Sequence, residues 1–462
     1  MRKLNRNHII IGIIILAIIS RLIFLDIRPL HHDEGVNYFF ADNILEGRGF
    51  AYDPLNYHGP SYFFILFLSF FLLGVNEFAL RFPSAIFGIA LVIIPLFLKN
   101  RRSYNKYLFS SLLLISPSLL YYSRYSIHES LFILAGFLGV YSLTTIIESK
   151  NLEQLPLFAL SLALLLVTKE TTIIMGFIMA VIVAVNYKEI SDIDFNDRKK
   201  IWASIVLFLL IYIVLFTSFF SNFSGLKNSF NGYLSWTERG LNEPGHQKPF
   251  YYYIELIAQY EFPLLLLSLV GLWACIKDRR NIFMRNMAIW FVFIFLIYSF
   301  IGYKTPWLVV NITLPMIMMA VIGIRHIPNR KISIAITGVA VIYLVFFSIY
   351  VNYVHTWQSD NYFAYVHTDG DILNLIKDLE GQYKSGERIL IVSDSYWPLP
   401  FYLDNKNVEY LDKVERAEFG NEYDYYIVKG DIFSNSILPD GYRYREYKLR
   451  DDVKLDLVYK IK

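Results

Sequence analysis

The chain has 462 residues, of which 55% are hydrophobic, 17% aromatic and 18% charged, and its mean hydropathy is +0.40. This composition excludes a single soluble globule, because soluble domains carry more charge and less apolar surface. Lysine and arginine total 43 against 40 for aspartate and glutamate, so no strongly basic surface is available and we expect no nucleic-acid partner. The one cysteine, Cys275, excludes an intramolecular disulfide.

Long apolar runs follow one another through the first three quarters of the chain. A helix rises about 1.5 Å per residue, so a run of about 20 residues crosses a hydrocarbon core of about 30 Å. The first run has no small-residue cleavage signal, and we expect it to be a retained helix. The runs predict eleven transmembrane helices, at 8–25, 83–98, 107–122, 128–147, 155–169, 171–187, 201–220, 256–276, 286–303, 306–324 and 332–352.

The apolar segment 61–75 is a twelfth candidate, but it is short and follows Gly59-Pro60. Charge parity decides between the two topologies. If 61–75 lies in the membrane interface, every strongly basic loop falls on one side, which the positive-inside bias assigns to the cytoplasm. If it crosses, all basic loops from 99–106 onward move outside. The sequence therefore predicts a cytoplasmic N-terminus and an interfacial helix in the first outer loop.

After residue 352 the long apolar runs stop and the charge increases. The pattern predicts a helix at 371–379 and a strand at 388–393. We therefore expect a transmembrane domain at 1–352 and a small extracytoplasmic α/β domain at 353–462.

The polar residues at span ends gather on the predicted outer side. The first outer loop opens with the run from His31 to Gly35, which holds two imidazoles and two carboxylates. A charge near the hydrocarbon boundary costs a few kcal/mol unless it is paired or faces a polar cavity. Each residue alone could be a snorkelling or salt-bridged side chain, for example Lys169 with Glu170. Together they indicate one polar cavity, and the others at outward turns are Arg124, His128, Glu129, Lys169, Glu170 and Lys304.

Two further imidazoles lie in predicted outer segments. His58 belongs to Tyr57-His58-Gly59-Pro60, and His246 lies in the loop 221–255. Such a pair could hold a divalent ion, although the sequence does not require a metal. The tyrosine run 251–253 in the same loop is typical of an interfacial aromatic belt.

Carboxylates and lysines beside a lipid boundary suit transfer of a group from a lipid-linked phosphate. A hydroxyl acceptor needs a positioned base, for which Asp33 is the candidate. The departing phosphate needs fixed cations, which Lys304, Lys169 and Arg124 could supply. Direct displacement without a covalent intermediate would invert the anomeric centre of the sugar.

Several separated motifs resemble those of the GT-C glycosyltransferases, in the branch of the dolichyl-phosphate-mannose protein mannosyltransferases and the aminoarabinose transferases of lipid A. The likeness extends over residues 1 to about 325. The motifs that carry it are His32-Asp33-Glu34, the segment 76–85, the turn Arg124 to Glu129, Thr168-Lys169 and Tyr303-Lys304-Thr305-Pro306-Trp307.

The resemblance implies a polytopic all-α fold with interfacial helices in the first outer loop, and a small C-terminal α/β domain. It implies that Asp33 and Glu34 are catalytic. It also implies that Arg124, Glu129, Lys169 and Lys304 bind the donor, while His32, Tyr57, His58 and His246 line a further pocket.

The segment Tyr57-His58-Gly59-Pro60 departs from the Glu-Lys-Pro of aminoarabinose transferases, which argues against lipid A modification. The motif combination looks closest to a largely archaeal subgroup associated with protein glycosylation gene clusters.

The expected function is transfer of a sugar from polyprenyl or dolichyl phosphate to a hydroxyl of a protein, glycan or lipid, on the outer face of the cell membrane. The alternative is a flippase-associated or transporter-like protein that binds lipid-linked sugars without chemistry. A transporter should place polar groups at the midplane of its spans, whereas here they gather at outer ends. Pro117, Asn311 and Pro315 lie within spans and weaken that contrast.

Overall fold

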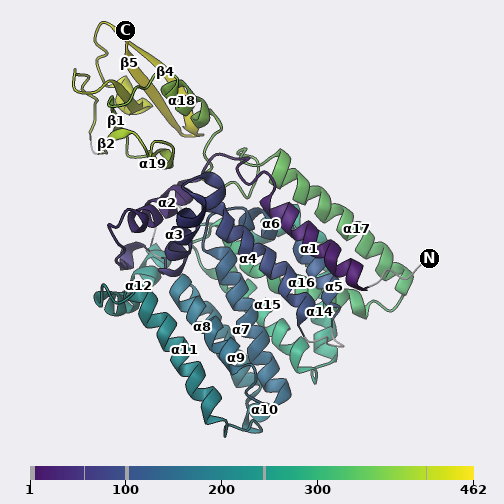
Figure 1. The fold of residues 1–462 in the computed structure, drawn as a ribbon. Coiled ribbons are helices and arrows are strands. Elements are labelled where there is room, and N and C mark those ends of the chain that lie inside the picture. Colours follow the sequence, from purple (N-terminus) through teal and green to yellow (C-terminus); the bar gives the residue numbers. More distant parts are fainter. Residues whose placement is uncertain (1–5, 57, 99–103, 243–245, 413, 462) are drawn as a thin grey trace. The chain divides into compact units, whose positions relative to one another are not determined.

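The computed structural model describes residues 6–56, 58–98, 104–242, 246–412 and 414–461. These residues form two units. The helical unit comprises Met1–Leu25 and Ile44–Val354, and the C-terminal unit comprises Asp26–Asn43 and His355–Lys462. Apolar helices dominate the first and a small sheet the second, as the sequence predicts (Figure 1).

The helical unit is built from consecutive helices that follow the apolar runs. Its elements are α1 Arg6–Leu22, η1 Pro54–Asn56, α3 Ser61–Leu73, α4 Glu77–Phe97, α5 Lys106–Ile115, α6 Pro117–Ser123, α7 Glu129–Ser149, α8 Leu155–Thr168, α9 Thr172–Val185, α10 Tyr187–Ser191, α11 Arg198–Phe216, α12 Ser224–Asn242, α13 Tyr252–Tyr260, α14 Phe262–Lys277, α15 Ile282–Phe300, η2 Pro306–Leu308, α16 Val309–His326, α17 Arg330–Ile349 and the π turn η3 Tyr350–Val354.

Among the described residues, six helices are long and apolar enough to cross a membrane, or up to seven if a bent pair is one span. Each of the eleven predicted runs contains helix, but several of these helices are shorter. α3 has 13 residues, about 20 Å of helix against a hydrocarbon core of about 30 Å. The number of crossings therefore stays a prediction. The six helices long and apolar enough to cross are α4, α7, α11, α15, α16 with η2, and α17 with η3.

The predicted span at 256–276 is divided into two helices in the structure, and whether the pair crosses the membrane stays a prediction. α13 and α14 meet at Glu261 with a bend of 110°. Pro263 stands in the first turn of α14, where its ring is incompatible with a helix continuing from the preceding turn. The predicted span at 107–122 is also interrupted, at Ser116 before Pro117.

The two interruptions meet at the Glu261 carboxylate. Its Oε1 accepts hydrogen bonds from the Ser116 hydroxyl at 2.8 Å, the Ser118 amide at 2.9 Å and the Ser118 hydroxyl at 2.6 Å. A lone acidic residue in an apolar run was the sequence signal for this junction, because such a residue is rare unless polar groups face it. Sequence reasoning missed it.

Helices α14 and α16 cross closely through two glycines. A Cβ on Gly271 would lie 2.0 Å from the Met319 carbonyl oxygen, and one on Gly323 would lie 2.2 Å from the Leu267 carbonyl oxygen. Small residues at such crossings let membrane helices approach backbone to backbone.

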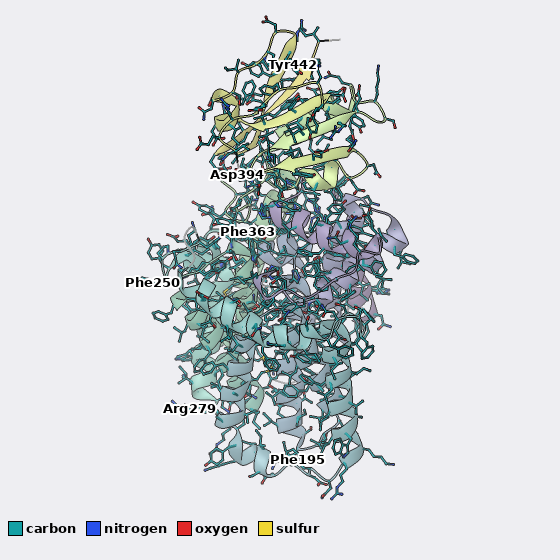
Figure 2. The ribbon with its side chains drawn as sticks, turned by 90° about the vertical axis from the view of Figure 1, so that its left-hand side faces the viewer. Phe195, Phe250, Arg279, Phe363, Asp394 and Tyr442 are labelled. Carbon is teal, nitrogen blue, oxygen red and sulfur yellow. The ribbon has the colours of Figure 1, made fainter. Side chains whose placement is uncertain are left out.

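Two of the loops predicted to be cytoplasmic lie toward the same end of the helical unit. Figure 2 shows Phe195, between α10 and α11, and Arg279, between α14 and α15, at the same end, with Phe250 of the long predicted outer loop toward the other.

The C-terminal unit contains a five-stranded sheet in the order β2-β1-β3-β5-β4. β1 is parallel to β2 and β3, while β5 is antiparallel to β3 and β4. The predicted helix and first strand are both confirmed. The elements are α18 Asp371–Glu380, β1 Arg388–Val392, α19 Leu399–Tyr402, β2 Asn407–Leu411, β3 Tyr425–Lys429, α20 Gly430–Ser434, β4 Tyr442–Arg450 and β5 Val453–Lys460.

The core of this unit forms between α18 and the sheet. Ile372, Leu375 and Leu379 of α18 are fully buried with Ile389 and Leu457 of the strands. The segment Asp26–Asn43, with most of α2 (His32–Leu45), belongs to the same unit. The division at 352/353 predicted from the sequence does not include this segment, since composition carries no signal for it.

Candidate active site

The N-terminus of α2 is fixed by a reciprocal cap around His31. The His31 Nδ1 accepts a hydrogen bond from the Asp33 amide at 3.0 Å, and the Glu34 carboxylate accepts one from the His31 amide at 3.0 Å. His31 thus takes the place of the serine or threonine of a capping box, with Glu34 as its acidic partner. Sequence reasoning did not assign this role to His31, although the spacing of three residues to Glu34 is the signature of such a box.

The capping arrangement fixes the tautomer of His31. Because Nδ1 accepts, Nε2 carries the proton and donates to the Tyr365 carbonyl oxygen at 2.8 Å. Burial lowers the pKa of His31 to about 3, so the ring is neutral at pH 7.

The two predicted catalytic carboxylates differ in their surroundings. Glu34 is fully buried and is held by the cap, whereas Asp33 is half-buried in the first turn of α2. A helix N-terminus favours the ionised form of a carboxylate. Asp33 is therefore the better candidate for a base, and Glu34 has a structural role whatever else it does.

His32 contacts residues that no local sequence signal could connect with it. Its ring lies 6.2 Å from that of Trp397, edge to face, and its Nδ1 lies 3.4 Å from Arg450 Nη2. Arg450 also donates to the Trp397 carbonyl oxygen at 2.7 Å. Burial lowers the pKa of His32 to about 4, outweighing the nearby Asp33 charge, so this ring is also neutral.

In the helical unit, Lys169 forms a buried ion pair with Glu129, and their side chains are 9% and 3% exposed. The sequence left open an ion pair between Lys169 and Glu170. In the structure, Lys169 pairs with Glu129 instead. Glu170 instead accepts a hydrogen bond from the Tyr52 hydroxyl at 2.8 Å, and burial raises the pKa of its carboxyl group.

The segment that leads into α3 is hydrogen-bonded to the end of α8, next to Lys169. The Gly59 amide donates to the Thr168 carbonyl oxygen at 3.0 Å, and the Ser61 and Thr168 hydroxyls lie 2.9 Å apart. A Cβ on Gly59 would lie 2.2 Å from the Val167 carbonyl oxygen, so only glycine fits this approach.

The His58 ring packs against that of His128, with centroids 4.3 Å apart and planes tilted by 38°. The sequence placed His128 among the polar residues of the predicted cavity but gave it no specific role. Tyr57 lies outside the described residues.

The two histidines of the predicted metal pair each have a ring contact with another residue. His58 contacts His128, and His246 contacts Tyr303, with ring centroids 4.8 Å apart. Within the described part of the chain, no group of three or more histidine, cysteine, aspartate or glutamate side chains could hold a metal ion. A metal at His58 and His246 stays a prediction.

A short backbone ladder joins the long outer loop to the turn before α16. The Lys304 amide donates to the His246 carbonyl oxygen at 2.9 Å, and the Lys248 amide donates to the Gly302 carbonyl oxygen at 3.1 Å. His246 and Lys304, predicted from distant segments, are therefore neighbours.

The Lys304 side chain is buried without a carboxylate partner among the residues that the structure describes. It is 1% exposed, and its ammonium donates to two backbone oxygens, of Ile301 and, at 3.3 Å, of Lys248. Burial lowers the pKa of Lys304. A buried cation held only by carbonyl oxygens is incompletely compensated, so the position suits an anion.

Two tyrosines pack beside the turn that carries Lys304. The Tyr253 hydroxyl donates to the Thr305 carbonyl oxygen at 3.1 Å, and its ring lies 6.2 Å from that of Tyr298. The convergence of Lys304 with Glu129 and Lys169 stays a prediction.

Arg124 is engaged at the C-terminal end of α1. Its guanidinium donates to four backbone carbonyl oxygens, those of Ser20, Arg21, Ile23 and Phe24, at 2.7 to 3.3 Å. The Tyr353 ring covers it at 4.6 Å. These contacts compensate the unpaired carbonyls of a helix end, and they give Arg124 a structural role beside its predicted one in donor binding.

Comparison with known proteins shows one sequence family and several solved structures that the chain resembles. Residues 57–217 match the sequence model of the dolichyl-phosphate-mannose-protein mannosyltransferase family. No curated protein sequence matches the chain. Among solved structures, the chain is similar to ArnT from Cupriavidus metallidurans bound to undecaprenyl phosphate, with a TM-score of 0.68 and 11% identity over 98% of both chains. The apo state of that protein gives a TM-score of 0.69 at the same identity and coverage.

The matched region contains His58, Glu129 and Lys169, and the structural likeness extends over both units of the chain. At this identity the likeness establishes the fold. The chain is a multi-pass membrane protein with a fold similar to that of ArnT, and its residues 57–217 resemble the dolichyl-phosphate-mannose-protein mannosyltransferases.

Proposed function

We propose that the protein is an integral-membrane glycosyltransferase that moves a sugar from a polyprenyl or dolichyl phosphate to a hydroxyl acceptor on the extracytoplasmic face of the cell membrane. The acceptor belongs to a protein, a glycan or a lipid, and the transfer inverts the anomeric centre.

The observation that carries this proposal is the buried Lys304 ammonium, which has no carboxylate partner in the described part of the chain. A departing lipid phosphate would supply the missing negative charge. The match of residues 57–217 to a family named for a dolichyl-phosphate-linked sugar supports such a donor, as does the undecaprenyl phosphate bound in the ArnT structure.

The reaction assigns each charged group one task. Asp33 takes the proton of the acceptor hydroxyl while its oxygen forms a bond to the anomeric carbon. The bond from that carbon to the phosphate oxygen breaks, and both its electrons leave with the lipid phosphate. Lys304 and Lys169 stabilise this growing charge, and Glu129 holds Lys169 in place.

The proposal is tested by donor turnover. The purified protein is incubated with polyprenyl phosphates carrying radiolabelled mannose, glucose or another sugar, together with total membrane acceptors. Release of free lipid phosphate with label in an acceptor is expected, and the product linkage should have the anomeric configuration opposite to that of the donor.

Binding of the donor without cleavage, with every sugar offered and with divalent metal supplied, would overturn the proposal. That result would favour the flippase-associated or transporter-like alternative. Retention of the anomeric configuration would overturn the direct displacement alone. The likeness to a largely archaeal subgroup remains a prediction that the identity of the acceptor would test.

A further inference from the structure

Within the C-terminal unit, the helix that carries Asp33 packs against Trp397 and Pro398 through one face. His32, Gly35 and Phe39 are three and four residues apart and therefore share this face of α2. His32 and Phe39 have ring contacts with Trp397 at 6.2 and 6.1 Å. A Cβ on Gly35 would lie 3.0 Å from the Trp397 ring and 3.0 Å from the Pro398 Cβ.

Four aromatic rings continue from this contact across the unit. Trp397 lies 6.1 Å from Phe39 and 5.5 Å from Tyr396, and Tyr396 lies 4.9 Å from Tyr410. We call Phe39, Tyr396, Trp397 and Tyr410 the aromatic surface. Phe39 is 43% and Tyr410 41% exposed, while the two rings between them are half-buried. Phe39 thus lies six residues along α2 from Asp33, less than two turns of helix.

The aromatic surface lies where an α/β sheet commonly binds a ligand. Tyr396 and Trp397 follow β1, and Tyr410 is the penultimate residue of β2, which is parallel to β1. The Ser393 amide donates to the Leu411 carbonyl oxygen at 3.0 Å and holds the two strand ends together. Ligands of such sheets bind outside the carboxyl ends of parallel strands. In Figure 2, Asp394 marks this end of the unit, and Tyr442 lies at the opposite end.

Carboxylates accompany the rings. Asp404 accepts a hydrogen bond from the Tyr38 hydroxyl, and the nearby negative charges of Asp404 and Asp412 act on Tyr410 and Tyr396 respectively. Flat aromatic faces pack against the C–H bonds of a sugar ring, and ionised carboxylates only accept hydrogen bonds, which suits sugar hydroxyls. An aromatic surface bordered by acceptors therefore matches a saccharide.

We infer that the aromatic surface binds a saccharide acceptor and presents its hydroxyl to Asp33, so that the C-terminal unit selects a glycan. This inference rests on the proposed function for its direction of transfer, but the binding itself requires no catalysis.

The test measures binding in the full-length protein, reconstituted in phospholipid nanodiscs. Glycoside detergents are left out because their sugar heads would compete for the surface. Maltotriose, mannotriose, chitotriose and an unglycosylated serine- and threonine-rich peptide are titrated calorimetrically into wild type, Tyr410→Ala and Phe39→Ala. The matched control is Tyr444→Ala, an exposed tyrosine on β4 at the far edge of the same sheet.

At least one trisaccharide is expected to bind the wild type. The Tyr410→Ala and Phe39→Ala variants should weaken this binding by up to about tenfold, the value of one aromatic contact. Tyr444→Ala should leave it unchanged, and all variants should bind polyprenyl-phosphate donor equally.

Three results would overturn the inference. Either no trisaccharide binds the wild type, or both variants bind it as tightly as the wild type does, or only the peptide binds and its binding needs Tyr410. The last result would make the acceptor a protein. Failure of the proposed function is seen separately, as absence of donor cleavage by a wild type that still binds the trisaccharide.

Discussion

The Lys169 ammonium is paired with the Glu129 carboxylate inside the helical unit, where both side chains are almost fully enclosed. Lys169 follows α8, and Glu129 is the first residue of α7. The pair therefore ties together two helix ends that the sequence separates by a long apolar hairpin. Its energetic value depends on both charges being present, because either charge alone would be buried without compensation.

Breaking this pair on one side is expected to destabilise the protein. Glu129→Gln and Lys169→Met should each lower the unfolding free energy by about 3 to 5 kcal/mol. The double variant should lose less than the sum of the two, since no lone charge remains. Thermal unfolding in detergent, followed by circular dichroism, measures all three. Additive losses would show that the two side chains do not interact.

Removal of the buried cation at Lys304 is expected to abolish most of the turnover. Lys304→Met should reduce kcat by about 10²- to 10³-fold, the usual loss when one fixed charge-stabilising group is removed from a transition state. The control is Lys227→Met, an exposed lysine on α12, which should behave as wild type. Equal activity of the two variants would remove Lys304 from the donor site.

The same lysine predicts an alkaline limit to activity. Burial lowers the pKa of Lys304, so it loses its proton at a lower pH than an ordinary lysine. Donor turnover should therefore fall as the pH rises toward the ordinary lysine pKa. Lys304→Arg, whose guanidinium keeps its charge, should move that fall to higher pH even if its maximum rate is lower. An unchanged alkaline limb in this variant would assign the limit to another group.

Because His31 is neutral in the folded chain, we expect α2 to lose stability in acid. Its pKa is about 3 in the folded chain, below the ordinary value of about 6.5. Protons therefore bind the unfolded form first, and stability is lost as the pH falls from about 6.5 toward 3. His31→Asn keeps a capping oxygen but cannot titrate, so it should flatten this dependence. Amide exchange of α2 between pH 7 and pH 5 measures it, and equal slopes for both proteins would contradict the assignment.

Because Gly35 lies against Trp397 and Pro398, we expect that a methyl group added at Gly35 displaces the nearby Asp33 carboxylate. Gly35→Ala would place a Cβ at 3.0 Å from both side chains, which forces α2 or Trp397 to move. Turnover should fall at least about tenfold, in line with the cost of small misplacement of a catalytic group, while donor binding is kept. Gly12→Ala on α1, whose Cβ would meet nothing within 4 Å, is the matched control. Similar rates for the two variants would exclude a positioning role of this contact.

Sequence reasoning reached the apolar helices and many of the polar residues, because hydropathy runs and charges near a membrane are local signals. The sequence did not predict which residues these polar side chains contact. His58 with His128 and Lys169 with Glu129 are pairs set by helix packing, and His31 with Tyr365 joins residues from opposite ends of the chain. The bend at Glu261 was missed for a different reason, since averaging hydropathy over a window conceals one carboxylate.

The most direct measurement compares lipid phosphate release by the wild type, Asp33→Asn and Glu46→Gln, the last an exposed acidic residue just after α2. The side-chain amide introduced by Asp33→Asn has nearly the shape of the carboxylate but cannot take the acceptor proton. The account predicts that Asp33→Asn folds normally, binds the lipid-linked sugar and releases no lipid phosphate, whereas Glu46→Gln behaves as wild type. A normal rate of transfer by Asp33→Asn would contradict the assignment of the base.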